Sequence, residues 1–355
     1  MGRRLLRFVC LLGVFGATAA AALAASPSVT TGTAIEVPGT AALNVGAAAG
    51  INAISCTSPG VCSLAGEYTD GAKRDLSFVA DENNGTWGNA TEIPGLESIS
   101  GHSSEERVFT ISCAKAGSCS AGGYYRDGNG NPQAFLVNEK NGVWANAVKV
   151  PGTKALGAPG GSAVLSLSCV KAGFCVGSGV YFTSHDEGRA FVVTEKNGAW
   201  KNAVKLTGPS GFSAGSDTEV SDISCTTTST CAAGGYYVIG VSKLQAFVVR
   251  ETSGVWRKAQ NVPGVPAILN GGSVVNSISC TASGQCAAGG SYSDPANTDY
   301  DFPFVVSEKN GVWAKATSCR LSATARSTRS RAPPPATALP AGITSTGPMS
   351  DTRSR

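Results

Sequence analysis

Paired cysteines are the residues of this chain whose spacing bears most directly on chemistry. Twelve cysteines are present, and ten of them form five pairs in which the second cysteine follows the first by six positions: Cys56 and Cys62, Cys113 and Cys119, Cys169 and Cys175, Cys225 and Cys231, and Cys280 and Cys286. Structural zinc sites usually take four Cys or His ligands. Each pair supplies only two thiols, and neither histidine, His102 or His185, lies at a repeated position. We therefore expect five structural disulfides and no metal site.

Other patterns that could carry chemistry are weaker. The run from Asp127 to Asn131 is similar to the beginning of a calcium loop, but Pro132 stands where the sharp turn needs glycine. The sequence has no glycine-rich phosphate loop, and its two histidines leave little scope for a Ser-His-Asp arrangement. We expect no catalytic residue and no cofactor.

Residues 1–25 have the pattern of a secretory signal peptide. Basic residues come first, an apolar run extends from Phe8 to Leu23, and Ala22-Leu23-Ala24 fits a small-residue cleavage site. The alternative, an uncleaved membrane anchor, would need a longer run with less alanine. The sequence thus predicts a secreted or cell-surface protein with no stable membrane span after cleavage. Export to an oxidising compartment also favours disulfides.

The cysteine pairs belong to a repeat of 55 to 57 residues. A tyrosine follows each second cysteine by six positions, at Tyr68, Tyr125, Tyr181, Tyr237 and Tyr292. A phenylalanine and a tryptophan come next in every unit, at Phe78, Phe135, Phe191, Phe247 and Phe304 and at Trp87, Trp144, Trp200, Trp256 and Trp313. Such periodicity is typical of stacked units that complete each other's core. Because the tyrosines recur in every unit, we interpret them as packing residues.

Each unit contains four short segments with strand character. They are exemplified by Asn276 to Cys280, CAAGGYY, QAFVV and VWRKAQNV, and an Asn-Gly or Ser-Gly turn separates the last two in each unit. We predict an all-β fold, a β-propeller of about five four-stranded blades spanning residues 33–317, with units that start near residues 52, 109, 165, 221 and 276. The segment Thr33 to Gly39 matches the end of a unit, so it offers an outer strand that could close the ring.

Arginines at the two ends of the chain account for its positive net charge. The formal net charge is +4, but without the signal peptide and the arginine-rich tail there remain 19 basic and 23 acidic residues. A mildly acidic repeat region with no basic cluster argues against nucleic acid as a partner.

Residues 318–355 lose the repeat and are rich in Ser, Arg, Pro and Thr, a composition typical of disorder. We hypothesise that this tail results from a shifted reading frame. If the third base of each codon is read with the first two of the next, the codons for Arg331/Ala332 and Thr337/Ala338 each permit cysteine, and those that follow permit Thr-Ala-Gly-Gly-Tyr-Tyr. The hypothesis is that the frame breaks near Thr317 and that the tail hides a sixth repeat. It would also explain why Cys319 has no pair.

The third and fourth strands resemble a known motif. FVVSEKNGVW, from Phe304 to Trp313, is similar to the Asp-box hairpin of sialidase-type propellers, Ser-x-Asp-x-Gly-x-Thr-Trp. One residue is missing between Gly and Trp, and Lys or Asn fills the acidic position, although Asp81-Glu82 comes nearer in the first unit. The whole array also resembles secreted repeat proteins of high-GC bacteria. The resemblance implies a propeller and, in some members, glycosidase activity.

A sialidase-like enzyme needs paired carboxylates and an arginine cluster for the substrate carboxylate. The arginines of the repeat region occupy no single equivalent position: Arg74, Arg107, Arg126, Arg189, Arg250 and Arg257. We therefore favour a secreted, non-catalytic recognition or surface module built of disulfide-stapled β repeats. A sialidase-like glycoside hydrolase and a structural β-repeat spacer are the alternatives, and enzyme activity is left open.

Variable loops indicate where a ligand would bind. The loops between the second and third strands differ from unit to unit, and recognition usually resides in variable loops on a rigid scaffold. Four aspartates lie in these loops, Asp70, Asp127, Asp186 and Asp294. We predict that they mark a binding face for an extracellular glycan or protein, with solvated turn residues as the alternative. The repeated glutamates Glu139, Glu195, Glu251 and Glu308 are expected to be solvated or paired across the strand.

Overall fold

The computed structural model describes residues 33–318 apart from 47, 103, 213–216, 241, 266–271, 282–283 and 295–296. The compact unit that holds the repeats ends at Cys319. The predicted signal peptide, residues 1–25, and the predicted tail, residues 318–355 apart from Ser318, lie outside the described residues, and both remain predictions.

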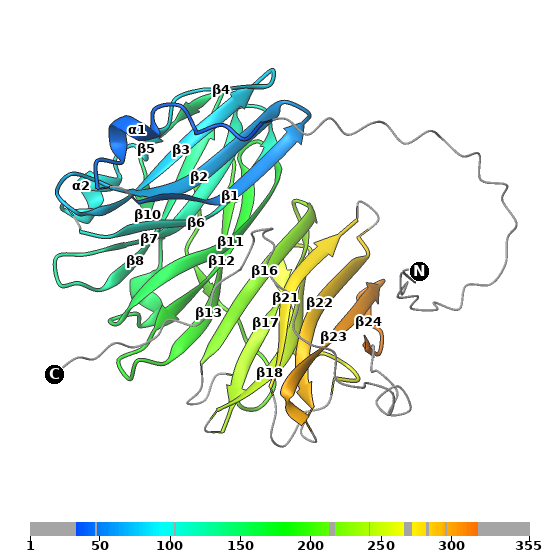
Figure 1. Cartoon of the computed structure of the whole chain (residues 1–355). Helices are drawn as coiled ribbons and strands as arrows, with labels where there is room; N and C mark the ends of the chain where they lie inside the picture. The colour runs from blue at the N-terminus through cyan, green and yellow to red at the C-terminus, as the bar shows by residue number, and fades with distance from the viewer. Residues whose placement is uncertain are drawn as a thin grey trace, which may run out of the picture. The chain divides into compact units, whose positions relative to one another are not determined.

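The described chain confirms the all-β prediction, because it folds into five antiparallel sheets, one for each repeat (Figure 1). The first sheet contains β1 (Ala49–Ser58), β2 (Val61–Thr69), β3 (Asp75–Asn83), β4 (Thr86–Trp87) and β5 (Thr91–Glu92). The second contains β6 (Glu106–Lys115), β7 (Ser118–Arg126), β8 (Pro132–Lys140), β9 (Val143–Trp144) and β10 (Val148–Lys149). The third contains β11 (Gly161–Lys171), β12 (Phe174–Phe182), β13 (Gly188–Lys196), β14 (Ala199–Trp200) and β15 (Val204–Lys205).

The remaining two sheets repeat the pattern. The fourth contains β16 (Thr218–Thr227), β17 (Thr230–Ile239), β18 (Lys243–Thr252), β19 (Val255–Trp256) and β20 (Gln260–Asn261). The fifth contains β21 (Ser273–Cys280), β22 (Cys286–Asp294), β23 (Asn297–Lys309), β24 (Val312–Trp313) and β25 (Thr317–Ser318). Short helical turns lie before the first sheet and in two links between sheets: α1 (Thr40–Leu43), α2 (Leu96–Ser100) and the 3-10 helix η1 (Thr153–Leu156).

The fourth strand of every sheet is broken into two short pieces that pair with the same third strand. In the fourth sheet the break lies between β19 and β20, where Ala259 N–H leaves the ladder and donates to Thr207 O at 2.7 Å. Thr207 belongs to the link that leaves the preceding sheet. Equivalent bonds join Ala147 to Pro94, Ala203 to Pro151 and Ala316 to Pro263. The break therefore lets each sheet bind the link of the sheet before it.

Successive sheets pack side by side through their first strands, since β1, β6, β11, β16 and β21 contact one another in series. The repeated tyrosines are at most 5% exposed, which confirms the packing role expected of them: Tyr68, Tyr125, Tyr181, Tyr237 and Tyr292. The repeated phenylalanines are buried as well, at most 2% exposed: Phe78, Phe135, Phe191, Phe247 and Phe304. Among the described residues, the first and fifth sheets make no extensive contact with each other.

Five disulfides join the first and second strands, one in each sheet, as expected from the spacing: Cys56–Cys62, Cys113–Cys119, Cys169–Cys175, Cys225–Cys231 and Cys280–Cys286. The two cysteines of each bridge lie directly opposite each other in the strand ladder. Paired strands thus bring the Cβ atoms within bridging reach, and each bridge closes a short loop that limits the unfolded chain.

The two ends of the sheets differ. At the end that we call the turn face, the turn between the first two strands binds the turn between the third and fourth, as in Gly85 N–H to Gly60 O at 2.9 Å. Asn84 and Gly85 have φ of 51° and 77°, as the predicted Asn-Gly turn requires. The loops between the second and third strands and the links between sheets lie at the opposite end, the loop face.

Residues 33–37 form no strand in the structure, and they make no ladder with the fifth sheet. The chain instead turns at Pro38 and Gly39, where Pro38 O accepts a hydrogen bond from Ala90 N–H of the first sheet at 2.7 Å. Closure of a ring by residues 33–39 is therefore not seen within the described chain.

Candidate functional site

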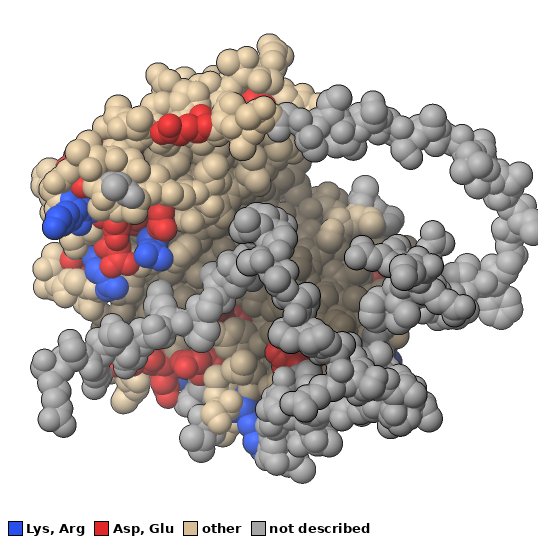
Figure 2. Space-filling model, viewed as in Figure 1, with Lys and Arg blue, Asp and Glu red and all other residues tan. Residues whose placement is uncertain are grey.

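Charged side chains gather on the loop face of the first two sheets. Figure 2 shows blue and red atoms together at the left of the view, over the end of the sheets where Figure 1 labels α2. We call this group the charged loop cluster and define it as Asp70, Arg74, Glu97, Glu105, Arg107 and Arg126. The residues come from the β2–β3 loop, the link that contains α2, and the adjoining ends of β6 and β7.

Every arginine of the charged loop cluster faces a carboxylate of the protein. Arg126 Nε donates to Glu105 Oε2 at 2.5 Å, and Tyr124 OH donates to the other oxygen of the same carboxylate. Burial of Glu105 opposes its ionisation, but these two hydrogen bonds and the nearby guanidinium groups outweigh it, so the pKa of Glu105 is lowered. Arg107 Nε lies 3.6 Å from Glu67 Oε2 and 3.7 Å from Glu105 Oε1. The cluster is thus largely neutralised from within.

Arg74 belongs to the same pattern on the β2–β3 loop. Its Nε donates to Asp70 Oδ2 at 2.8 Å, and its Nη1 lies 3.5 Å from Glu97 Oε1. Glu97 also contacts His102, whose Nδ1 lies 2.6 Å from Glu97 Oε1. Hydrogen bonding to His102 and Arg74 lowers the pKa of Glu97.

The predicted aspartates lie at the ends of separate sheets. Asp70 Oδ1 accepts hydrogen bonds from Ala72 N–H and Arg74 N–H, and the bond from the Arg74 backbone is the main reason why the pKa of Asp70 is lowered. Asp127 Oδ1 accepts from Asn129 N–H and Asn131 N–H. Both carboxylates therefore hold their own loops. Of the two, only Asp70 joins the charged loop cluster.

The other two aspartates are placed differently. Asp186 lies in the β12–β13 loop with φ of 58°, and Thr183 Oγ1 there accepts the loop hydrogen bonds that an aspartate accepts in the first two sheets. The backbone of Asp294 pairs with Asn297, and its side chain is outside the described part of the structure. The structure does not bring the four aspartates to one centre.

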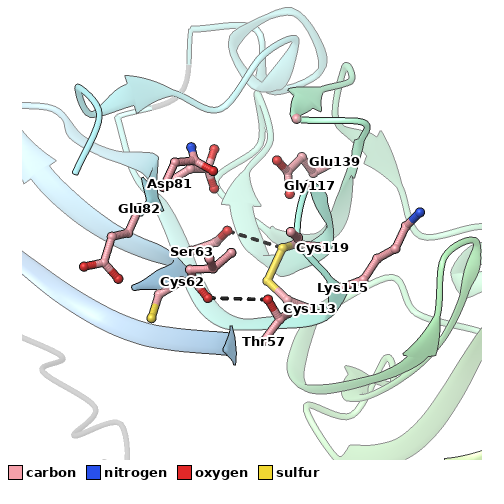
Figure 3. Close-up of a pocket in the computed structure, with 14 residues that line it drawn as sticks. Thr57, Cys62, Ser63, Asp81, Glu82, Cys113, Lys115, Gly117, Cys119 and Glu139 are labelled. Carbon is pink, nitrogen blue, oxygen red and sulfur yellow. Dashed lines mark hydrogen bonds between the residues drawn. A yellow bond between two sulfur atoms is a disulfide. The ribbon is translucent and has the colours of Figure 1, made fainter. Parts of the chain in front are cut away.

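A second candidate site lies between the first two sheets near the turn face (Figure 3). Asp81 of β3 and Glu139 of β8 line a pocket of about 60 Å³ together with Ser63, Lys115 and Gly117. Asp81 Oδ2 accepts a hydrogen bond from Trp144 Nε1 at 3.0 Å, whereas Asp81 Oδ1 and Glu139 Oε2 are buried without a hydrogen-bond partner. Burial, reinforced by the charge of Asp81, raises the pKa of Glu139 to about 7.

The glutamates at this repeat position correct one expectation from the sequence. Glu139, Glu195, Glu251 and Glu308 are between 2% and 5% exposed, so they are not solvated. Each faces the preceding sheet, as Glu195 Oε1 does in accepting from Asn138 Nδ2 at 2.6 Å. The position two residues from a turn made them look exposed, and the sequence carried no signal for the sheet that covers them.

The geometry restricts the possible chemistry. A pocket of about 60 Å³ has room for a few water molecules. A smaller pocket of about 30 Å³ lies beside Tyr68, Arg74 and Glu106, where burial raises the pKa of Glu106 to about 7. In the described part of the chain, no group of three or more His, Cys, Asp or Glu side chains is arranged to hold a metal ion.

The arginines that the sequence did not group, Arg74, Arg107 and Arg126, do come together through the link after the first sheet. Asp75 N–H donates to Ser104 O, and Arg126 N–H donates to Glu105 O, each at 3.0 Å. This link therefore bridges both sheets. The sequence offered one signal for the charged loop cluster: an Arg or a Glu lies beside the variable loops in consecutive units.

No protein-family model matches this sequence. No curated protein is significantly similar to it. Within the described chain, no helix has the length and apolar character needed to cross a membrane.

Solved structures with a similar course of the chain are diverse. A Hadza microbial sialidase aligns at 12% identity over 76% of this chain and 58% of its own length, with a TM-score of 0.43. A protein of unknown function from Dyadobacter fermentans aligns at 10% identity over 76% of this chain and 82% of that one, with a TM-score of 0.46. The α-L-arabinanase of Penicillium chrysogenum aligns at 9% identity over 76% and 80%, with a TM-score of 0.44. Similarity of this size says nothing about substrate or activity, and the chain spans little more than half of the sialidase.

Proposed function

We propose that this chain is an exported, non-catalytic recognition module that binds a protein partner through the loop face of its first two sheets. The observation that carries the proposal is the charged loop cluster, a dense surface group of ion pairs that the repeat does not require. Residues that depart from a repeat on variable loops are favoured positions for recognition. Mixed charges of this kind give orientation and specificity to protein contacts.

Two features favour recognition over catalysis. The arginines of the cluster are occupied by Glu67, Asp70, Glu97 and Glu105, so a substrate carboxylate would have to displace a protein carboxylate. The two pockets described above measure about 60 and 30 Å³, and neither is large enough to enclose a sugar ring. A sialidase-like hydrolase is therefore the less favoured alternative.

The nature of the exposed side chains favours a protein over a glycan. The strongly exposed large hydrophobic side chains in the described chain are all isoleucine or valine, and none is a Trp, Tyr or Phe ring on which a sugar could stack. The five disulfides agree with an exported protein. Asp70 and Asp127 support this face by fixing the conformation of its loops.

Site-specific photo-crosslinking tests the proposal. A benzophenone side chain at exposed Ala72 would report on the loop face, and one at Val143, which is 69% exposed on the turn face, would serve as the matched control. With intact cells of the producing organism, we expect a discrete protein adduct from position 72 and none from position 143. The charge reversal Arg126→Glu should weaken the adduct at least about tenfold, because it sets like charges against Glu105.

The same samples distinguish the alternatives. Turnover of a chromogenic sialoside or another glycoside would overturn the non-catalytic assignment. Saturable binding to a glycan panel, sensitive to Arg126→Glu and without a protein adduct, would replace the protein partner by a glycan. Equal adducts from both positions would remove the loop face as the binding surface.

A further inference from the structure

The two end sheets of the array expose faces that the internal sheets bury. Five positions before the first cysteine, Ile51 of the first sheet is 54% exposed, whereas its equivalents are 0% exposed: Val108, Val164, Val220 and Val275. Two positions before that cysteine, Ile54 is 57% exposed, whereas its equivalents are at most 7% exposed: Ile111, Leu167, Ile223 and Ile278. All of these side chains are branched aliphatic ones, so the missing neighbouring sheet accounts for the difference in exposure.

The fifth sheet shows the complementary deficit on its opposite face. Val305 is 60% exposed, whereas its equivalents are at most 2% exposed: Val79, Leu136, Val192 and Val248. Three positions after the second cysteine, a Cβ atom on Gly234 would lie 2.6 Å from Val275 Cγ1 of the next sheet. The equivalent Gly289 meets no atom of another sheet within 4 Å. The fifth sheet thus keeps the hollow into which the next sheet's apolar side chain fits.

A polar contact also repeats across every internal interface. A serine hydroxyl of one sheet accepts from the cysteine N–H of the next at 2.9 to 3.0 Å, in the pairs Ser55 and Cys113, Ser112 and Cys169, Ser168 and Cys225, and Ser224 and Cys280. The unused members of this series are Cys56 N–H on the first sheet and the Ser279 hydroxyl on the fifth. The two end faces are therefore the two sides of interfaces of the established type.

The link before the first sheet shows what kind of sheet fits there. In each internal interface, the link that leaves one sheet offers a carbonyl to the fourth strand of the next. On the first sheet Pro38 O already fills this position, against Ala90 N–H at 2.7 Å. Residues 33–37, which run into Pro38, thus stand where a preceding sheet would have its fourth strand. The fifth sheet cannot supply that link, because its own fourth strand is β25.

We propose that the space between the two end faces takes one further repeat unit, a sixth sheet of this same protein. Its fourth strand is supplied by residues 33–37, and its first three strands are encoded downstream of Ser318 in the shifted frame. The new sheet would bury Ile51 and Ile54 on one side and Val305 and Gly289 on the other.

The codons of residues 326–355 permit the residues that these faces need. In the shifted frame, Arg326/Ser327 permits Val, five positions before the first hidden cysteine at Arg331/Ala332. Pro340/Ala341 permits Gly, three positions after the second hidden cysteine at Thr337/Ala338. Arg353/Ser354 permits Phe sixteen positions after that cysteine, the interval that separates Phe135 from Cys119. The shifted codons therefore permit an apolar side chain, a glycine and a core phenylalanine at the positions that the repeat requires.

The test compares two proteins. The written chain has the sequence printed above, and the extended chain continues after Ser318 with a copy of residues 262–309, which are the link and first three strands of the fifth repeat. We expect the extended chain to be monomeric, with a Tm about 5 °C or more higher. Amide hydrogen exchange in β1 should become at least about tenfold slower, because its outer face is then covered. In the chain as written, β1 should exchange faster than β6.

Three results would overturn the proposal. Equal protection of β1 and β6 in a monomer of the written chain would mean that the end faces already meet each other. A dimer of the written chain that Ile51→Asp dissociates would mean that a second copy occupies the space. No gain in Tm or protection in the extended chain would mean that the faces do not accept this unit.

A matched pair of substitutions keeps the comparison specific. In the extended chain, Ile51→Asp should abolish the gain in Tm and in β1 protection, because it places a charge in the new interface. Val143→Asp, at a residue 69% exposed on the turn face, should leave both gains intact. Loss of the gain in both variants would count against the proposal.

Discussion

The interface between the first and second sheets and the interface between the fourth and fifth bury the same repeated glutamate against opposite charges. Glu139 faces Asp81, and one oxygen of each carboxylate has no hydrogen-bond partner. Glu308 faces Arg250, whose Nη1 donates to it. A pocket opens at the first interface. The comparison teaches that the repeat specifies a buried acid, while one variable residue on the preceding sheet decides whether the acid is paired.

The second interface lies between these extremes. Asn138 donates to Glu195 and, through Oδ1, accepts from Ser120 Oγ at 2.9 Å and Trp200 Nε1 at 3.0 Å. An amide at this position satisfies the glutamate and the tryptophan together. Asp81 can do only the second, because an ionised carboxylate has no proton to donate.

Removal of Arg250 should have the largest effect. Arg250→Ala leaves the Glu308 carboxylate buried without its cation, and breaking a buried pair in this way costs about 3 kcal/mol of unfolding free energy. Chemical denaturation at pH 7 would measure the loss. Arg257→Ala, in the break of the fourth strand, is the control and should cost less than about 0.5 kcal/mol. Similar losses in both variants would contradict the buried pair.

An acid placed in the second interface should reproduce the opposed carboxylates of the first interface. Asn138→Asp sets a carboxylate against Glu195 and removes its donor, which should cost about 2 kcal/mol at pH 8. Chemical denaturation of the variant at pH 8 and at pH 4 measures this cost. It should be smaller at pH 4, because protonation of Glu195 relieves the repulsion between the two carboxylates. An equal cost at both pH values would mean that packing, and not charge, is responsible.

The reverse change in the first interface should stabilise the protein. Asp81→Asn offers Glu139 a donor and keeps an acceptor for Trp144, so we expect a gain of about 1 kcal/mol in unfolding free energy at pH 8. The gain should vanish near pH 4, where Glu139 is protonated in both folded and unfolded chains. A loss of stability at pH 8 would show that the carboxylate of Asp81 has a structural role of its own.

The pH dependence gives the most specific test, because it follows a single carboxyl group. Since the folded pKa of Glu139, about 7, lies above its unfolded value, its contribution to stability is present at low pH and is lost as the pH rises toward 7. Relative to the wild type, Glu139→Gln should therefore gain up to about 3 kcal/mol between pH 4 and pH 8, since the folded pKa of about 7 exceeds the ordinary value of 4.5. The difference between the two unfolding curves isolates this group from carboxylates such as Glu105, whose pKa is lowered. A flat difference would contradict the raised pKa.

Much of the fold could be predicted from the repeat because its signals are local. The spacing of Cys113 and Cys119 anticipates a disulfide across a tight turn, and Asn141-Gly142 anticipates the hairpin, since both depend on a few consecutive residues. The charged loop cluster could not be predicted, because Arg74, Glu105 and Arg126 meet through a link whose path no periodicity encodes.

The sequence by itself determined the five-fold array and the disulfides, because both depend on spacings within one repeat, and the recurrence of the tyrosines marked them as packing residues. The tertiary structure alone decided the environment of residues that face another sheet. Ile51 and Val108 occupy the same repeat position, yet one is 54% exposed and the other 0% exposed. Glu139 and Glu308 likewise share a position but face an acid and a base. Burial and pKa depend on the neighbour, and the neighbour is set by packing between units, not by the unit's own sequence.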